Sequence, residues 1–320
     1  MSKKRVKKQK EYKEHLGFEG GIRELWKNKF LYLMTLPGII WLLVFCYYPM
    51  YGVLIAFKDF SYTAGIWKSP WVGFKNFQFL FNYNGVGRIF TNTIVLNVFF
   101  LASTTIMSIL LALVFVEIKR KFYNRLVQTI AIFPHFVSWA VVAMFMSGII
   151  GSSGILTKWI LSMGGENPSF YNDPTWWPLI LTILRVWQGA GYGSIVYVAA
   201  ITGFDQEMYE AARVDGATRF QQIIQITLPL LKTTAIMLTI MGIGKIFNGD
   251  FGMIYALVGD NAALYKTTDV VDTFVYRALR ELNNLGMSTA TSLFQSVVGL
   301  ILVYLTNKVT KKIEPDAAIF

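Results

Sequence analysis

The chain contains very few of the residues that form disulfides, hold metals or move protons in catalysis. Of its 320 residues, one is cysteine and two are histidine. Cys46 lies in an apolar run and has no second cysteine for a disulfide, a zinc site or an iron–sulfur cluster. His15 and His135 are too few for a His-based metal site or a Ser-His-Asp triad. We therefore predict no catalytic residue and no metal site in this chain.

The sequence also lacks the phosphate-binding motif G-x-x-x-x-G-K-[ST]. The nearest string, at residues 242–245, has neither the required spacing nor a following Ser or Thr. We therefore predict that the chain does not bind ATP through this motif and has no cofactor of its own. A transport process driven by ATP would need a separate subunit to supply it.

Charged residues are scarce, at 15% of the chain, whereas 54% of the residues are hydrophobic. This composition excludes disorder and favours a protein that crosses a membrane several times. The formal net charge of +11 could indicate nucleic-acid binding. The position of the charge argues against it, because Lys and Arg gather in alternate loops, as they do in membrane proteins.

Six apolar runs are long enough to cross a bilayer, which needs about 20 residues. They are residues 32–56, 90–116, 130–150, 179–201, 230–246 and 290–305. Pro37 and Pro49 should bend or end the first. With the N-terminus inside, about two thirds of the 30 Lys and Arg residues fall in cytoplasmic segments. We predict an all-α, multi-pass membrane protein with six transmembrane helices and both termini in the cytoplasm.

The segments between the runs differ in character. Ile22, Leu25, Trp26 and Phe30 repeat at helical spacing and fit a short interfacial helix or, equally, a continuation of the first span. Residues 59–87 are rich in aromatic side chains and are expected to fold over the outer membrane surface. Residues 154–163 form an amphipathic segment too short to span, and 248–288 form the longest outer loop.

The stretch 204–229 is the one polar island in the second half of the chain. Asp205 is expected to cap a first helix, which Gly216 ends, because glycine adopts a positive φ at little cost. Thr218 and Gln221 have the spacing of a capping box, which starts a second helix leading through Pro229 into the fifth span. This pattern predicts two helices joined by a glycine turn, on the cytoplasmic side, and indicates a docking element.

Polar and aromatic residues inside the fourth span and after the fifth are candidates for contact with a solute. Aromatic faces and amide groups suit a sugar, which needs stacking surfaces and partners for its hydroxyls. The predicted substrate-binding residues are Trp187, Gln188, Tyr192, Phe247, Asn248, Asp250 and Phe251. The alternatives are close helix packing through the glycines of the fourth span and a loose pair of Lys245 with Asp250. We expect His135 to be structural.

Residues 210–229 carry a signature: E-A-A, three residues, G, nine residues, I-x-L-P. This pattern resembles the signature loop of the permease subunits of bacterial binding-protein-dependent ABC importers. The strings LPGIIWLLVFCYYPMYGV, FNGDF and LGMSTATSLF are similar to those of carbohydrate permeases of the maltose-transporter type, and most closely to oligosaccharide permeases described as lipoprotein-associated.

The resemblance implies a type I ABC importer permease fold, in which residues 204–229 form a coupling helix seated in a cytoplasmic ATPase. The implied coupling residues are Glu207, Glu210, Ala211, Ala212, Arg213, Asp215, Gly216, Ala217 and Pro229. The implied partners are a second homologous permease, two ATPase subunits carrying ATP and Mg²⁺, membrane lipid and an extracellular solute-binding lipoprotein that delivers an oligosaccharide. Where relatives have an asparagine-rich string, this chain has Gly249 and Asp250.

The resulting hypothesis is a translocation subunit of the bacterial cell membrane, not an enzyme. Its predicted parts are a basic tail over 1–29, a permease domain over 30–310 and a cytoplasmic tail over 311–320. The main alternative is a secondary transporter or channel for a polar solute. That class predicts a membrane carboxylate or a symmetric pair of half-helices, and the predicted spans contain neither.

Overall fold

The computed structural model describes residues 26–78, 85–281 and 283–319. The described residues are almost all helical, and an isolated bridge between Lys58 and Trp71 is the only β-pairing among them. Six of their helical segments are long and apolar enough to cross a membrane: Lys29–Phe57, Val86–Glu117, Trp139–Ser162, Trp177–Thr202, Arg219–Ile243 and Leu285–Ile313. The chain divides into two compact units, Met1–Leu54 and Ile55–Phe320.

The described part of the first unit is one helical segment whose form changes along its length. α3 (Lys29–Leu42) is α-helical and contains Pro37, and it continues as the π-turn η1 (Leu43–Tyr47) and the 3₁₀ segment η2 (Tyr48–Phe57). Pro49 has no N–H for the helical ladder, and the wider turn just before it, with Tyr48 N–H bonded to Leu43 C=O, accommodates this loss. The α-helix therefore ends before Pro49 but passes through Pro37. Of the proposed interfacial helix, Ile22 and Leu25 lie outside the described residues.

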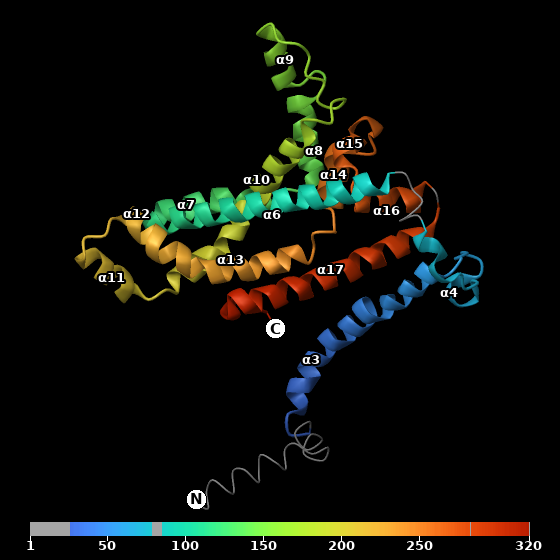
Figure 1. The fold of residues 1–320 in the computed structure, drawn as a ribbon, viewed down its shortest axis with the longest axis horizontal. Coiled ribbons are helices and arrows are strands. Elements are labelled where there is room, and N and C mark those ends of the chain that lie inside the picture. Colours follow the sequence, from blue (N-terminus) through green and yellow to red (C-terminus); the bar gives the residue numbers. More distant parts are fainter. Residues whose placement is uncertain (1–25, 79–84, 282, 320) are drawn as a thin grey trace, which may run out of the picture. The chain divides into compact units, whose positions relative to one another are not determined.

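In the second unit, long helices pack side by side. They are α6 (Val86–Glu117), α10 (Trp177–Thr202), α13 (Leu228–Ile243) and α17 (Leu285–Ile313) (Figure 1). The last span is longer than residues 290–305 because Asn284 caps it, accepting a bond from Met287 N–H. The short helix η7 (Pro315–Ala317) follows α17 in the sequence. Just before η7, Glu314 forms an ion pair with Lys232 of α13 at 2.6 Å.

The third predicted span, 130–150, is wrong as a continuous helix. The run is divided among α7 (Lys121–Ile132), the 3₁₀ turn η4 (Phe133–Phe136) and α8 (Trp139–Ile150). Pro134 cannot continue the α-helical ladder, and Val137 and Ser138 are extended. α9 (Ile155–Ser162) confirms the short helix expected near 154–163, and together α8 and α9 form the candidate span Trp139–Ser162.

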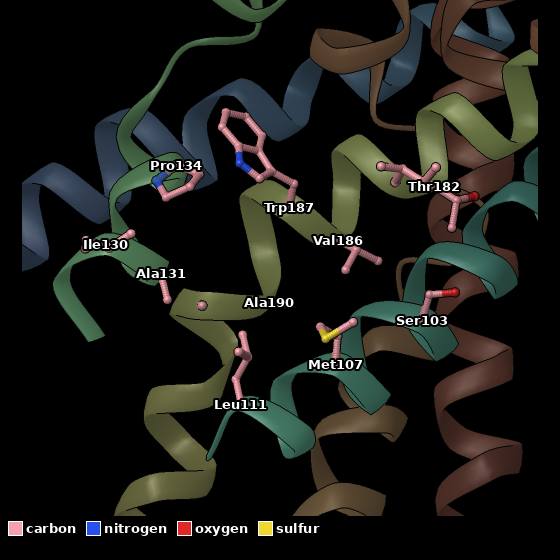
Figure 2. A pocket seen from close by; sticks show the side chains of 12 residues that line it. Ser103, Met107, Leu111, Ile130, Ala131, Pro134, Thr182, Val186, Trp187 and Ala190 are labelled. Atoms are coloured by element: carbon pink, nitrogen blue, oxygen red, sulfur yellow. The ribbon is translucent and has the colours of Figure 1, made fainter. Parts of the chain in front are cut away.

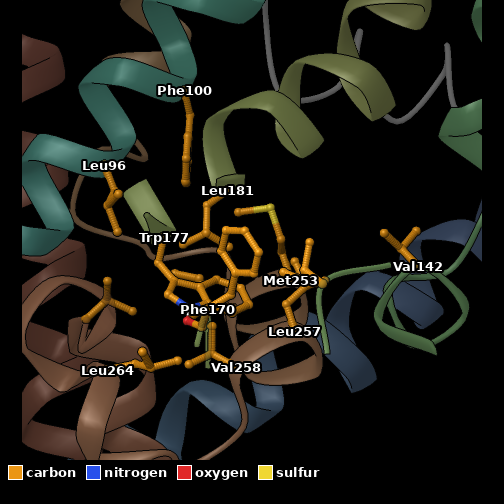
Figure 3. Close-up of a cluster of buried hydrophobic side chains, with 13 residues drawn as sticks. Leu96, Phe100, Val142, Phe170, Trp177, Leu181, Met253, Leu257, Val258 and Leu264 are labelled. Atoms are coloured by element: carbon orange, nitrogen blue, oxygen red, sulfur yellow. Dashed lines mark hydrogen bonds between the residues drawn. The ribbon is translucent and has the colours of Figure 1, made fainter. Parts of the chain in front are cut away.

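The predicted outer loop 248–288 is instead a group of short helices. They are α14 (Phe251–Val258), η6 (Ala262–Leu264), α15 (Tyr265–Thr268) and α16 (Val271–Arg280). Apolar side chains of α14 and η6 join those of α6, α8 and α10 in a buried cluster around Trp177, whose indole N–H donates to Phe170 C=O (Figure 3). Those of α16 pack in a separate cluster with Ile89 of α6. These helices lie at the end of α6 and α10 away from residues 204–229 (Figure 1).

Polar contacts fix this helical group internally. Arg277 forms two bonds to the buried carboxylate of Asp269, at 2.7 and 2.8 Å, and a third contact to Asp260. Tyr265 donates its hydroxyl to Asp260, and burial raises the pKa of Tyr265 to about 12, so the hydroxyl keeps its proton. The amide of Asn92 donates to three backbone carbonyls of residues 265–269 and so ties the group to α6.

The aromatic segment 59–87 is compact where it is described. α4 (Gly65–Lys68) and the 3₁₀ turn η3 (Gly73–Phe77) follow one another, and the ring of Phe57 stacks on Trp71 with centroids 5.7 Å apart. Phe74 and Phe77 also contact the Phe57 ring. These contacts explain why the segment needs many aromatic residues, while its place on an outer membrane surface stays a prediction.

Candidate functional site

The stretch 204–229 has the two helices and the turn that its sequence predicts. In α11 (Gln206–Val214), Asp205 accepts a hydrogen bond from Glu207 N–H at 3.0 Å, so it caps the helix. Gly216 has φ +83°, and Ala217 N–H closes the helix end onto Ala212 C=O at 2.8 Å. These bonds confirm the predicted cap and the glycine turn.

The second helix is also confirmed, and it runs on into the fifth span. α12 (Arg219–Gln222) begins with the capping box, in which Thr218 accepts from Gln221 N–H and Gln221 accepts from Thr218 N–H. A π-turn, η5 (Ile223–Thr227), then precedes Pro229 in α13 and absorbs its missing N–H. We call α12, η5 and α13 the α12–α13 rod, because they form one continuous helical segment, Arg219–Ile243.

The outer face of this stretch is uncovered. None of the side chains of α11, all of which are described, is buried, and the apolar Val214 and Phe220 are 87% and 70% exposed. Among the predicted coupling residues, Ala212 and Ala217 are half-buried, and the remaining ones are exposed: Glu207, Glu210, Ala211, Arg213, Asp215, Gly216 and Pro229. The structure brings them to one end of the second unit (Figure 1).

On its inner side, α11 is fixed to the rest of the unit. Tyr209 and Thr227 share a hydrogen bond between their hydroxyl groups at 3.1 Å, which ties α11 to η5. Around these residues lies a small cavity of about 320 Å³, also lined by Lys119, Arg213 and Arg219. This bond and the turn through Gly216 connect α11 to the α12–α13 rod.

A second cavity, which we call the polar cavity, lies between α6, α10 and the segment that joins α13 to α14. Its volume is about 410 Å³. Its polar and charged lining residues are Asn97, Thr104, Thr105, Arg185, Lys245, Asn248 and Asp250, with Phe251 at one wall. The structure thus brings three of the predicted substrate-binding residues together in one cavity.

Arg185 is the residue of the fourth span that lines this cavity, and it is not among the predicted substrate-binding residues. Its guanidinium donates to the carboxylate of Asp250 at 2.7 Å, and Asp250 also accepts Met253 N–H, which caps α14. The expected alternative, a pair of Lys245 with Asp250, is therefore not formed. Residues 185 and 250 lie far apart in the sequence, so no local pattern could reveal the contact.

The other predicted substrate-binding residues lie elsewhere. Trp187 lines a separate, largely apolar groove of about 650 Å³ between α6, α7 and α10 (Figure 2). Gln188 is buried and donates to Val137 C=O at 3.0 Å.

Tyr192 stacks on His135 with ring centroids 4.1 Å apart, which agrees with a structural role for His135. Phe247 packs against Phe90 beside the polar cavity.

Close packing explains one of the fourth-span glycines directly. A Cβ added at Gly191 would lie 1.8 Å from the backbone oxygen of Ala131, which leaves no room for a side chain. The absence of a Cβ therefore lets α7 pack directly on α10, as small residues do between membrane helices. This supports the packing alternative for that position.

Comparison with known proteins identifies the kind of molecule. Residues 104–315 match the family model described as binding-protein-dependent transport system inner membrane component. The chain belongs to this family. It is therefore a multi-pass membrane permease subunit and a translocation component, which confirms the predicted fold and transporter class.

Individual relatives match almost the whole chain. Protein LplB of Bacillus subtilis is 39% identical over 291 residues, which are 91% of each chain. The polygalacturonan/rhamnogalacturonan transport system permease protein YteP of the same organism is 38% identical over 290 residues, 90% of each chain. A crystal structure of a bacterial ABC transporter involved in the import of the acidic polysaccharide alginate contains a chain with TM-score 0.82 and 35% identity, covering 91% of this chain and 98% of that one.

Proposed function

We propose that this permease carries an oligosaccharide across the bacterial cell membrane as part of an ATP-driven importer. The observation that carries the proposal is the similarity over nine tenths of the chain to a permease named for polygalacturonan and rhamnogalacturonan transport and to a chain of the alginate importer. The polar cavity supports it, since amide, hydroxyl and aromatic groups suit a sugar, and about 300 Å³ or more is usual for ligand sites.

The proposal includes the partners. A second, homologous permease would complete the pathway, two ATPase subunits would bind ATP and Mg²⁺, and an extracellular binding protein would deliver the sugar. A solved structure of the alginate transporter in complex with its pentasaccharide-bound periplasmic protein, similar to this chain at TM-score 0.81, supports that arrangement. The membrane would hold residues 30–310, with the tails 1–29 and 311–320 in the cytoplasm.

In this proposal α11 is the coupling helix and Glu210 contacts the ATPase. Three features support the assignment: α11 is capped at both ends, its outer face is exposed, and its inner side is fixed to the α12–α13 rod. Such an element transmits displacement as a rigid body when the ATPase subunits close. The substrate contacts assigned to this chain are Asn248, Asp250 and Phe251, with Phe247 beside them.

Reconstitution tests the function. The permease, its partner permease and the ATPase subunit are co-expressed, purified as one complex and placed in proteoliposomes with the binding protein outside. We expect uptake of a labelled oligosaccharide to require ATP inside the vesicles and the binding protein in the medium. Uptake driven by an ion gradient without ATP would instead support a secondary transporter, as would failure of the ATPase to co-purify.

A further inference from the structure

The charges that line the polar cavity are unequal in number. Two cations, Arg185 and Lys245, face one anion, Asp250. Each oxygen of Asp250 already accepts one hydrogen bond, Oδ2 from Arg185 and Oδ1 from Met253 N–H. The Arg185 charge is thus neutralised inside the protein, and the cavity has an excess positive charge at Lys245.

Lys245 has no ion pair or side-chain hydrogen bond within the part of the chain that the structure describes. It lies just after α13, in a turn fixed by a 3.0 Å bond from its own N–H to Gly242 C=O, and its side chain is exposed. An ionisable group among membrane helices marks a candidate pathway for a charged solute, and the exposed Lys245 side chain at this cavity is accessible to one. An anionic solute would provide a counter-charge.

A second carboxylate, that of Asp272, lies beside Gly249 and is bonded to other groups. Its Oδ2 accepts Gly249 N–H and the side-chain amide of Gln295. Burial raises the pKa of Asp272 above its usual value. Among the described residues, no ion pair joins Asp272 to Lys245.

The remaining walls of the cavity suit the neutral parts of a sugar. Asn97, Thr105 and Asn248 offer amide and hydroxyl groups to sugar hydroxyls. Phe251 lines the cavity and stacks on Tyr255 at 5.0 Å and an interplanar angle of 18°, and Tyr276 contacts both rings. Of these three rings, Phe251 lines the cavity, and the two tyrosines support it as a stacking surface for the apolar face of a pyranose.

We propose that the polar cavity binds a uronate-containing oligosaccharide, with the sugar carboxylate facing Lys245 and the sugar ring on the stacking surface of Phe251. Arg185 acts as a positioning residue: its ion pair compensates the negative charge of Asp250, so that Asp250 can contact sugar hydroxyls without opposing the sugar carboxylate. This assignment rests on the proposed function, in that the chain must carry an oligosaccharide, and it adds the charge class of the solute and the residue that selects it.

The test compares the binding of an acidic oligosaccharide with the binding of its uncharged methyl ester. The purified permease–ATPase complex is titrated with a galacturonate trimer and with the same trimer fully methyl-esterified, which keeps the size and most hydroxyls but removes the charge. We expect the wild type to bind the acid at least about tenfold more tightly than the ester, a difference of about 1.4 kcal/mol. Raised salt should reduce only the binding of the acid. This comparison needs no variant.

Variants then identify the residue. Lys245→Gln should remove the preference for the acid without weakening binding of the ester, whereas Lys245→Arg should keep the preference. Lys158→Gln, on α9 and outside the cavity lining, removes the same charge elsewhere and should leave the preference unchanged. Equal binding of acid and ester by the wild type, or an unchanged preference in Lys245→Gln, would overturn the proposal.

The outcome is separable from that of the proposed function. ATP-driven uptake of neutral oligosaccharides together with indifference to the uronate would reject this inference and keep the function. Tight binding of a sugar phosphate but not of the uronate trimer would likewise reject the uronate assignment. Absence of ATP-driven uptake of any oligosaccharide, even though the acid binds preferentially, would reject the function and keep the charge selectivity of the cavity.

Discussion

The turn at Gly216 allows a quantitative test of the link between α11 and the α12–α13 rod. Gly216 has φ +83°, and a Cβ added there would meet no described atom within 4 Å. A side chain at this position therefore costs only the strain of the left-handed conformation, about 1–2 kcal/mol for residues other than Gly and, to a lesser degree, Asn and Asp. That strain lowers the population of the native turn, relative to other conformations of this segment, by a factor of roughly 5–30.

The substitutions are Gly216→Val, Gly216→Ala and Gly216→Asn in the reconstituted importer, with the ratio of sugar molecules imported to ATP molecules hydrolysed as the readout. We expect Val and Ala to lower this ratio several-fold, because α11 then moves without a fixed connection to the rod. Asn should stay near wild type, since it tolerates a positive φ. Hydrolysis itself should continue in all three.

Gly203→Ala is the matched control, because Gly203 ends α10 just before α11 with φ −87°. Alanine adopts that conformation without strain, and its Cβ would lie no closer than 3.4 Å to its nearest neighbour. The reasoning is refuted if Gly216→Val imports sugar with the wild-type ratio. It is also refuted if Gly203→Ala uncouples the two activities to the same degree.

Three further substitutions test the packing of the second unit, each by thermal unfolding of the purified protein. Asp269→Asn leaves the half-buried Arg277 without its bidentate partner and should cost about 3–5 kcal/mol, seen as a clearly lower Tm. Burial raises the pKa of Asp272, so the free energy of unfolding of the wild type should fall as pH rises from about 4 through that raised pKa. Asp272→Asn should not show this decrease. Gly191→Ala should reduce the yield of folded protein, because its Cβ would overlap the backbone of α7, whereas Gly148→Ala on α8 meets no described atom and should be neutral.

For each of these three substitutions, one result would contradict the expected effect. A wild-type Tm for Asp269→Asn would mean that Arg277 does not depend on that carboxylate. Parallel pH profiles for the wild type and Asp272→Asn would assign the pH dependence to another group. Normal expression and Tm for Gly191→Ala would show that α7 can move away from α10 at little cost.

Local signals in the sequence predicted the features that depend on neighbouring residues. The caps at Asp205 and Thr218 and the turn at Gly216 follow from side chains within three residues of the bonds they make, so their geometry is readable from the chain. The six candidate spans follow from runs of apolar residues. Pro134 indicates a break in the third span, although the run of apolar residues over 130–150 continues across it.

The features that the sequence did not predict depend on contacts between distant residues. Arg185 and Asp250 are separated by 65 positions, and the three bonds from Asn92 reach residues more than 170 positions away. The same limit applies to Trp187, which the sequence predicts to lie with Asp250. Positions two apart on α10 face different neighbours, so Arg185 lines the polar cavity while Trp187 lines the apolar groove (Figure 2).

The α12–α13 rod also has a simple mechanical property. Arg219–Ile243 comprises 25 residues, so the rod is about 35 Å long at about 1.5 Å per residue. One of its ends adjoins α11, and its last residues, with Gly242, adjoin the polar cavity. A tilt of about 5° at the α11 end would therefore displace the cavity wall by about 3 Å, roughly the width of a water molecule. Because the backbone hydrogen bonds of the rod carry such a displacement along its length, substitutions in the side-chain packing along α13 should change the stability of the protein more than the size of this displacement.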